Sequence, residues 1–243
     1  MKKLTVLALA IFFRVAAYSQ PAALPRINQF VDISGTVGSS EGSIAGSYVY
    51  NWRIGKRRKW EAGLGIRSTS YFGTKKDFRT APARLARSTT TPFIIVFAGQ
   101  ETQNWDTLTV QRPFINSVNV SVNFGYNFNP KWSGGFNIDL IGFSFGRKSS
   151  AILTSSGVTR TEPAAFTPAF NLLLTGDNDY GSLNSEFFLK YKLSAHWGIR
   201  AIYQFYFGEY KTNDVKQTAP DGTIVDRFRN KANTYGAGLA YHF

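Results

Sequence analysis

The alternating run from Ser117 to Phe128, "SVNVSVNFGYNF", limits the possible folds more than any other part of the chain. Its apolar residues occupy every second position, and the positions between them are Ser, Asn or Gly. Successive side chains of a strand point to opposite faces, so the run predicts a strand with one apolar and one polar face. It reaches the roughly 9–11 residues that cross a bilayer as a tilted strand, whereas strands of soluble proteins usually have about 5–6. The consistently polar second face fits the lumen of a membrane barrel.

The first residues predict export. Lys2 and Lys3 precede an apolar run from Leu4 to Phe13, and small residues follow at Ala17 and Ser19. This is the pattern of a secretory signal peptide, residues 1–19, with cleavage near Ser19 and a mature domain spanning 20–243. The alternative is an uncleaved N-terminal anchor helix. No other apolar run approaches the roughly 20 residues of a spanning helix, so a membrane domain would have to cross with strands.

Tryptophan recurs beside short turns. The segments "GKRRKW", "NPKW" and "SAHW" each end in a Trp that opens an alternating strand, and one more Trp closes the strand before the first of them. Aromatic residues gather at membrane interfaces, so we expect these four to form a girdle on the side of the short turns: Trp52, Trp60, Trp132 and Trp197.

The alternation predicts an all-β, antiparallel, up-and-down transmembrane barrel of eight strands. We expect them at residues 27–38, 43–54, 60–72, 114–128, 132–145, 182–193, 197–207 and 231–243. The short turns would face the periplasm, and residues 39–42, 73–113, 146–181 and 208–230 would be extracellular loops. Residues 166–182 are expected to form a structured part of an outer loop, and residues 92–99 a hairpin projecting above the membrane. Ten strands remain an alternative if a turn is misplaced.

The segment "TYGAGLAYHF" at the carboxyl end predicts the last strand, which would close against the first. It resembles the closing strand of bacterial outer-membrane barrels, which commonly ends in Phe with apolar residues at alternate positions before it. Tyr235, Leu239, Tyr241 and Phe243 match that assembly signal, and Ala237 is smaller than usual. The resemblance is to small eight-stranded barrels of the OmpA/OmpX kind. It implies recognition by the barrel-assembly machinery and a place in the outer membrane of a Gram-negative bacterium, but no activity.

The charge of the chain raises nucleic acid as a partner, but the pattern argues against it. The net charge is +13, yet aromatic residues make up 16% of the chain, which suits a sheet with an apolar face. The run Lys56 to Lys59 lies in a tight turn between two strands, where contact with lipid phosphates or other anions near peptidoglycan is simpler. We therefore expect no nucleic-acid partner and no cofactor. Without cysteine, disulfides play no part.

Charged residues fall on the faces that should line the lumen: Arg53, Glu61, Arg67, Asp139, Glu186, Lys190, Lys192 and Arg200. A narrow barrel must pair such charges or hydrate them. We expect a salt-bridged plug because eight strands leave room for little beyond side chains. The alternative is a narrow channel for ions or small solutes, which four inward glycines would favour: Gly63, Gly65, Gly125 and Gly135.

Catalysis is the third hypothesis. Lipid A deacylases, palmitoyltransferases, phospholipases and omptin proteases are enzymes of this architecture that use histidine, but this chain has only His196 and His242, both expected at the periplasmic rim. Asp177 and Asp179 suggest calcium, but they lack the rest of an EF-hand loop, and an Asx-capped turn is the default.

The long loops carry the remaining functional signal. Five cations against one acid mark the first half of the loop after residue 72: Lys75, Lys76, Arg79, Arg84 and Arg87, with Asp77. Phosphorylated lipopolysaccharide would attract such a cluster, and a merely solvated loop is the alternative. We expect a non-catalytic barrel with a structural or surface-interaction role carried by these loops. The sequence leaves the oligomeric state open.

Overall fold

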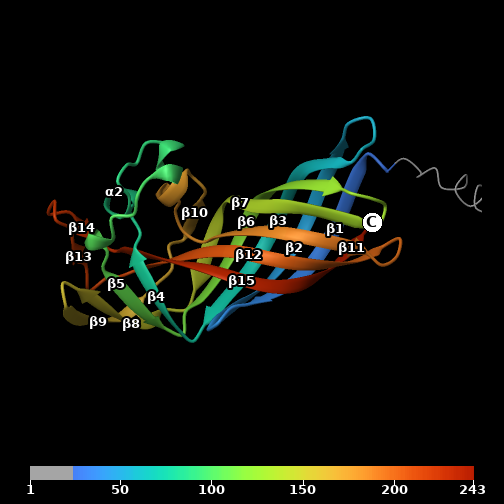
Figure 1. Cartoon of the computed structure of the whole chain (residues 1–243). Coiled ribbons are helices and arrows are strands. Elements are labelled where there is room, and N and C mark those ends of the chain that lie inside the picture. The colour runs from blue at the N-terminus through green and yellow to red at the C-terminus, as the bar shows by residue number, and fades with distance from the viewer. Residues whose placement is uncertain (1–23) are drawn as a thin grey trace, which may run out of the picture.

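Eight antiparallel strands form a closed barrel in the computed structural model, which describes residues 24–243 (Figure 1). The expected signal peptide, residues 1–19, lies outside this range. The strands are β1 (Ile27–Val37), β2 (Glu41–Ile54), β3 (Trp60–Gly73), β6 (Phe114–Asn127), β7 (Trp132–Gly146), β11 (Leu183–Lys192), β12 (Trp197–Lys211) and β15 (Arg227–His242). The fold class and all eight expected strands are therefore confirmed.

The last strand closes the barrel against the first. β1 and β15 pair from Phe30 opposite His242 to Val37 opposite Tyr235, and β15 pairs on its other side with β12. Each strand thus has two neighbours, and no edge of the barrel is left without hydrogen bonds. We call the end with the short turns 55–59, 128–131 and 193–196 the turn end, and the opposite end the loop end.

The loop end carries a second sheet, which the sequence did not predict. β12 and β15 continue beyond the barrel, and β15 pairs there with β4 (Lys75–Thr80). The sheet continues through β5 (Thr107–Gln111), β8 (Ser149–Ser155) and β9 (Val158–Ala165). Phe166 then pairs with Lys211 of β12 through N–O distances of 3.0 and 2.7 Å. This bridge joins the ends of the sheet into a ring, which we call the cap (the left half of Figure 1).

The cap has its own apolar core. Alternate residues of its short strands point inward, including Phe78, Leu108, Leu153 and Phe228, all fully buried. Below them the rings of Tyr71 and Tyr206 stack with centroids 4.5 Å apart, at the level where the cap meets the barrel. The cap therefore covers the upper opening of the lumen with packed side chains.

One expected hairpin is wrong. Residues 92–99 do not pair with each other. Instead they contain the 3-10 helix η1 (Ile94–Phe97), while β4 and β5 on either side of this segment form the hairpin. Pro92 has no N–H for a ladder, and Phe93 adopts a positive φ of 65°, which turns the chain at this point.

The other loop expectation is confirmed. Within residues 166–182, β10 (Phe170–Leu172) pairs with β7 as part of a structured loop and does not add a spanning strand. The smaller elements are α2 (Ala83–Ala86), η2 (Thr102–Asn104), η3 (Gly176–Asn178), β13 (Gln217–Thr218) and β14 (Ile224–Val225). None of the helices in residues 24–243 is long and apolar enough to cross a membrane.

Candidate functional site: a closed lumen and a cationic pocket

Glu61 organises the charged layer of the lumen nearest the turn end. Its carboxylate accepts a hydrogen bond from Arg53 Nε at 2.8 Å and others from the amide groups of Asn28 and Asn127, each also at 2.8 Å. These partners come from β1, β2 and β6, because the inward positions of these strands meet at one height. The layer thus joins three strands around one buried carboxylate.

The central layer is a network of two arginines and three carboxylates. Arg67 Nη2 lies 2.6 Å from Asp139 Oδ1, and Arg67 Nη1 lies 3.4 Å from Glu186 Oε1. Arg200 binds the other oxygen of Glu186 at 2.8 Å and also pairs with Asp32. The network therefore spans the lumen from β3 through β7, β11 and β12 to β1.

The charges inside the lumen balance. Four cations face four carboxylates: Arg53, Arg67, Lys190 and Arg200 against Asp32, Glu61, Asp139 and Glu186. At the central layer Arg67 is 2% exposed and Asp139 0% exposed, so these side chains are packed into the middle of the lumen. The geometry is that of a salt-bridged plug. Lys192 does not join it, since its side chain is exposed at the turn end.

Neighbouring atoms lie close to the four inward glycines. A Cβ on Gly63 would lie 2.4 Å from Asn51 Oδ1, and one on Gly65 would lie 2.9 Å from Ser121 Oγ. A Cβ on Gly135 would lie 2.6 Å from the ring of Phe188, and one on Gly125 would lie 3.5 Å from Glu61 Cβ. Neighbouring atoms thus occupy the space beside Gly63, Gly65 and Gly135, so these three glycines make room for the plug, whereas a Cβ on Gly125 would make an ordinary contact.

At the loop end, a charge cluster forms around Asp177 in the loop that follows β10. Its carboxylate pairs with Arg87 and Lys231, and it lies 3.4 Å from Arg229 Nη1. Arg229 also binds the buried Glu209 at 2.6 Å. Within residues 24–243, no group of three or more His, Cys, Asp or Glu side chains is placed to hold a metal ion. Three cations occupy the space around Asp177, which argues against the calcium alternative.

The two aspartates of this loop titrate differently. Burial by itself would raise the pKa of Asp177, but its bonds to Lys231 and Arg87 and the charge of Arg229 outweigh burial and lower the pKa below its usual value. Burial raises the pKa of Asp179 to about 6, despite the hydrogen bond from Leu174 N–H and the charge of Arg229. Asp177 is therefore a fixed negative charge, whereas Asp179 changes charge in mildly acidic solution.

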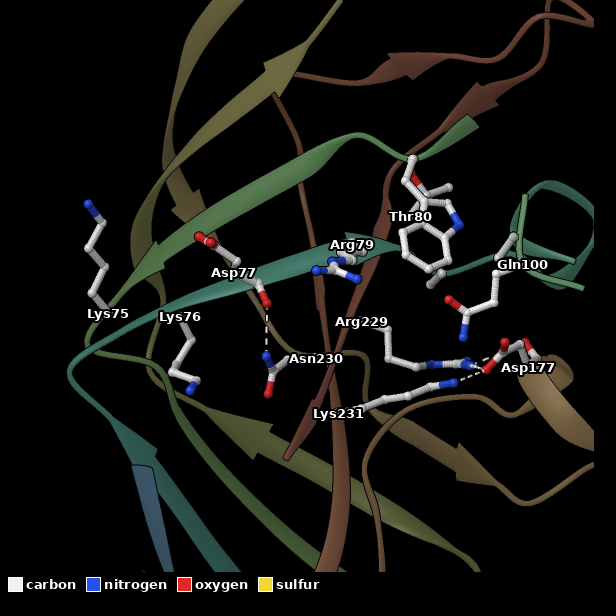
Figure 2. Close-up of a pocket in the computed structure, with 13 residues that line it drawn as sticks. Lys75, Lys76, Asp77, Arg79, Thr80, Gln100, Asp177, Arg229, Asn230 and Lys231 are labelled. Atoms are coloured by element: carbon white, nitrogen blue, oxygen red, sulfur yellow. Dashed lines mark hydrogen bonds and ion pairs between the residues drawn. The ribbon is translucent and has the colours of Figure 1, made fainter. Parts of the chain in front are cut away.

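Beside this cluster lies a pocket of about 500 Å³ on the outer face of β4 and β15 (Figure 2). Five cations and two carboxylates line it: Lys75, Lys76, Arg79, Arg229 and Lys231 with Asp77 and Asp177. Figure 2 shows Arg229 and Lys231 pointing to Asp177 across the pocket. Among the described residues, Lys75 and Arg79 form no ion pair, and the Arg79 guanidinium lies 5.0 Å from the centre of the Trp105 ring. The pocket thus offers free positive charge beside an aromatic surface and the polar side chains of Gln100 and Asn230.

The exterior of the barrel is apolar. Large hydrophobic side chains are exposed along every strand, among them Ile33, Ile66, Phe143 and Phe187. Exposed apolar surface on this scale is not found on soluble monomers, whereas a transmembrane barrel needs it to face lipid. The closed ring of strands and this exterior make the barrel transmembrane.

The four expected girdle residues, Trp52, Trp60, Trp132 and Trp197, all project outward near the turn end, with exposed side chains. In the closing strand, Tyr235, Leu239 and Phe243 are exposed on the same outer surface, and Tyr241 packs edge-on against Trp197 with centroids 5.0 Å apart.

Several solved structures are similar to this chain at low sequence identity. Ail of Yersinia pestis is 10% identical with a TM-score of 0.36, the alignment covering 90% of this chain and all of Ail. A major outer membrane protein of Thermus thermophilus is 12% identical (TM-score 0.38, 89% of this chain and 99% of that one). Neisserial surface protein A is 10% identical (TM-score 0.32, 89% and 96%). No protein-family model and no curated protein matches the sequence. The closed ring of eight antiparallel strands is established by the pairing of this chain's own strands.

Both histidines lie at the turn end of the barrel. His196 Nδ1 lies 2.9 Å from the carbonyl oxygen of His242, and His242 Nδ1 lies 2.9 Å from Asn28 Oδ1. Neither histidine bonds a carboxylate directly: Glu61, at the same end, is bound to Arg53 and is linked to His242 only through Asn28, and the carboxylates of the Asp177 cluster are at the opposite end.

Two site residues were missing from the sequence-based interpretation. Asp32 occupies an inward position of β1, and the alternation of that strand does contain the signal, although the inward Phe30 interrupts its polar face. Glu209 lies beyond the expected end of β12, in a stretch that was taken for a loop. No local pattern in the sequence marks it as buried.

Proposed function

We propose that the chain is a non-catalytic surface protein of a Gram-negative outer membrane, with its loop end outside the cell and its cationic pocket binding phosphate or other anionic groups of lipopolysaccharide. The carrying observation is the pocket itself, where five cations outnumber two carboxylates and, among the described residues, Lys75 and Arg79 form no ion pair. A pocket with excess positive charge attracts anions and raises their local concentration. The short turns would then face the periplasm, as in barrels of this class.

The channel hypothesis has less support than this one, because side chains fill the lumen and its three arginines are paired with carboxylates. An enzyme has less support still, since both histidines lie away from the pocket. For assembly, we propose that the barrel-assembly machinery recognises the outward residues Tyr235, Leu239 and Tyr241 of β15 together with Phe243, which follows directly after it. They lie on the strand that must finally pair with β1.

The test is binding of the refolded protein, in an uncharged detergent, to immobilised lipopolysaccharide. The pocket variant is the double change Lys75→Gln and Arg79→Gln. The control is Lys148→Gln with Lys216→Gln, two exposed cations of the loop end that do not line the pocket and remove the same charge. If each pocket cation contributes on the order of 1 kcal/mol, affinity should fall about tenfold in the pocket variant.

Dephosphorylated lipopolysaccharide should bind the unchanged protein about as weakly as the pocket variant binds the intact lipid. Equal losses in the pocket and control variants would mean that general positive charge, and not the pocket, attracts the lipid.

A further inference from the structure

The turn end of the lumen contains a second, separate cationic hollow of about 110 Å³. Its cations come from two strands and one turn: Arg53 of β2, which pairs with Glu61, Lys190 and Lys192 of β11, and Lys131 of the turn 128–131. Among the described residues that line it there is no aspartate or glutamate side chain. The hollow lies at the opposite end of the molecule from the pocket of the proposed function and does not depend on it.

Lys190 is the unusual member of this group. Its side chain is 8% exposed, yet within residues 24–243 its ammonium group has neither an ion pair nor a hydrogen-bond partner, and it lies 4.2 Å from the centre of the Phe30 ring. The nearest acidic layer offers it no direct contact, because Glu61 is already bonded to Arg53, Asn28 and Asn127. An ammonium group removed from water costs several kcal/mol unless an anion compensates it.

Further cations around the hollow add to its positive electrostatic potential. Lys131 and Lys192 are exposed at its rim, and the turn 55–59 contributes four further cations, Lys56, Arg57, Arg58 and Lys59. Arg58 is held in a positive-φ conformation and donates to the carbonyl of Leu24 at 2.7 Å, which keeps the turn folded toward the opening. Lysine binds phosphate as a point charge, and clustered lysine and arginine residues in a small cavity are the usual means of holding one.

We propose that this hollow binds a phosphate group, with Lys190 beneath it and Lys131, Lys192 and Arg53 around it. The size of the hollow suits one such group and not an extended polymer. The phosphate belongs either to a free anion or to the headgroup of an anionic phospholipid in the adjacent leaflet. Both present the same oxygens to the same cations.

The first experiment measures binding of inorganic phosphate to the refolded protein in an uncharged detergent, by calorimetry and by broadening of the phosphorus-31 resonance. Lys190→Met keeps the length of the side chain and removes the charge, and it should weaken binding at least tenfold. The control Lys148→Gln removes an exposed cation at the opposite end of the molecule and should change affinity less than twofold. Circular dichroism and heat-dependent gel mobility establish that each variant is folded.

If Lys190→Met fails to fold, the double variant Lys131→Gln and Lys192→Gln takes its place, since both residues are exposed. It should weaken binding severalfold. A second arm uses vesicles of phosphatidylcholine with and without phosphatidylglycerol, followed by native mass spectrometry of the extracted protein. Retention of phosphatidylglycerol that depends on Lys190 would identify the lipid as the source, and Lys190-dependent binding of inorganic phosphate alone would identify the free anion. The absence of binding in both arms, or binding that persists in the lysine variants, would overturn the proposal.

Discussion

Arg67 lies at the centre of the charge network in the lumen. Its guanidinium contacts Asp139 and Glu186 and donates to the backbone carbonyl of Asn184 at 2.5 Å. Each of these partners is buried, so water does not replace the arginine if it is removed. Breaking one side of a buried ion pair is costly because the remaining charge stays in a poorly solvated site.

Arg67→Met should therefore destabilise the folded barrel by about 3–5 kcal/mol. The measurement is the urea midpoint of the protein folded in detergent micelles, read by tryptophan fluorescence. Arg57→Met, in an exposed turn, removes the same charge and should change the free energy of unfolding by less than about 0.5 kcal/mol. Equal midpoints for the two variants would contradict the assignment of Arg67 to the network.

Asp179 gives the loop end a dependence on pH. Because burial raises its folded-state pKa from 3.8 to about 6, the folded loop binds protons more readily than the unfolded loop. Stability from this group is thus fully present below about pH 4 and is lost as the pH rises through 6. Amide hydrogen exchange of residues 174–181, corrected for its intrinsic pH dependence, should be slower at pH 5 than at pH 7.5. In Asp179→Asn the difference should disappear, and its persistence would assign the effect to another group.

The long loops form the cap, and Glu162 links two of its segments, β9 and the residues that follow β12. Its Oε2 accepts hydrogen bonds from three successive backbone N–H groups, those of Asn213, Asp214 and Val215, at 2.9–3.2 Å. The carboxylate is fully buried on β9, so it fixes the start of the loop between β12 and β15 against the rest of the cap.

Glu162→Gln should loosen that loop without opening the barrel, because a neutral amide loses the charge-assisted bonds and presents one oxygen to donors that need a carboxylate. Trypsin should cut faster after Lys216, which lies in this loop, while the membrane-spanning fragment stays folded. Glu101→Gln, in an exposed loop, is the matched control and should leave the cleavage rate unchanged. The same rate in all three proteins would show that Glu162 does not hold the loop.

The barrel strands could be predicted because their alternation extends over ten or more residues, whereas the cap strands could not. β4, with the sequence KKDFRT, and β9, with VTRTEPAA, are short and charged, and their pairing depends on partners far away in the chain. In β7 the alternation changes phase: Phe136 and Ile138 precede Asp139, but beyond Leu140 the outward residues are Ile141 and Phe143. A bulge at Leu140 causes the change, and the carbonyl of Leu140 accepts a hydrogen bond from Leu173 N–H at 2.7 Å. The sequence of β7 shows the change of phase at Leu140, but no local pattern shows that Leu173 hydrogen-bonds to this bulge.

At the scale of the whole molecule, the paired lumen and the cap above it oppose ion flow. The charged pocket and hollow lie at opposite ends, with the plug between them. The protein therefore has two separate cationic surfaces, the pocket at the loop end and the hollow at the turn end, joined by one membrane-spanning barrel.

Planar bilayers that contain the refolded protein should accordingly show no conductance steps. The variants Glu186→Gln and Arg200→Gln should not produce conductance steps of reproducible size either. Protease protection and heat-dependent gel mobility establish insertion, so that silence reports a closed lumen and not missing protein. Reproducible steps whose size changes in the two variants would replace the surface-binding proposal with the channel.

The pairing of β1 with β15 also determines when the molecule can finish folding. These strands come from opposite ends of the described chain, and contacts between residues so distant in sequence form slowly because a long loop must close first. Until β15 arrives, both β1 and β12 expose an unpaired edge, and the cap lacks the strand on which β4 docks. The pairing of β15 therefore completes the barrel and the cap in one late step. A protein whose barrel has closed also has a complete cap.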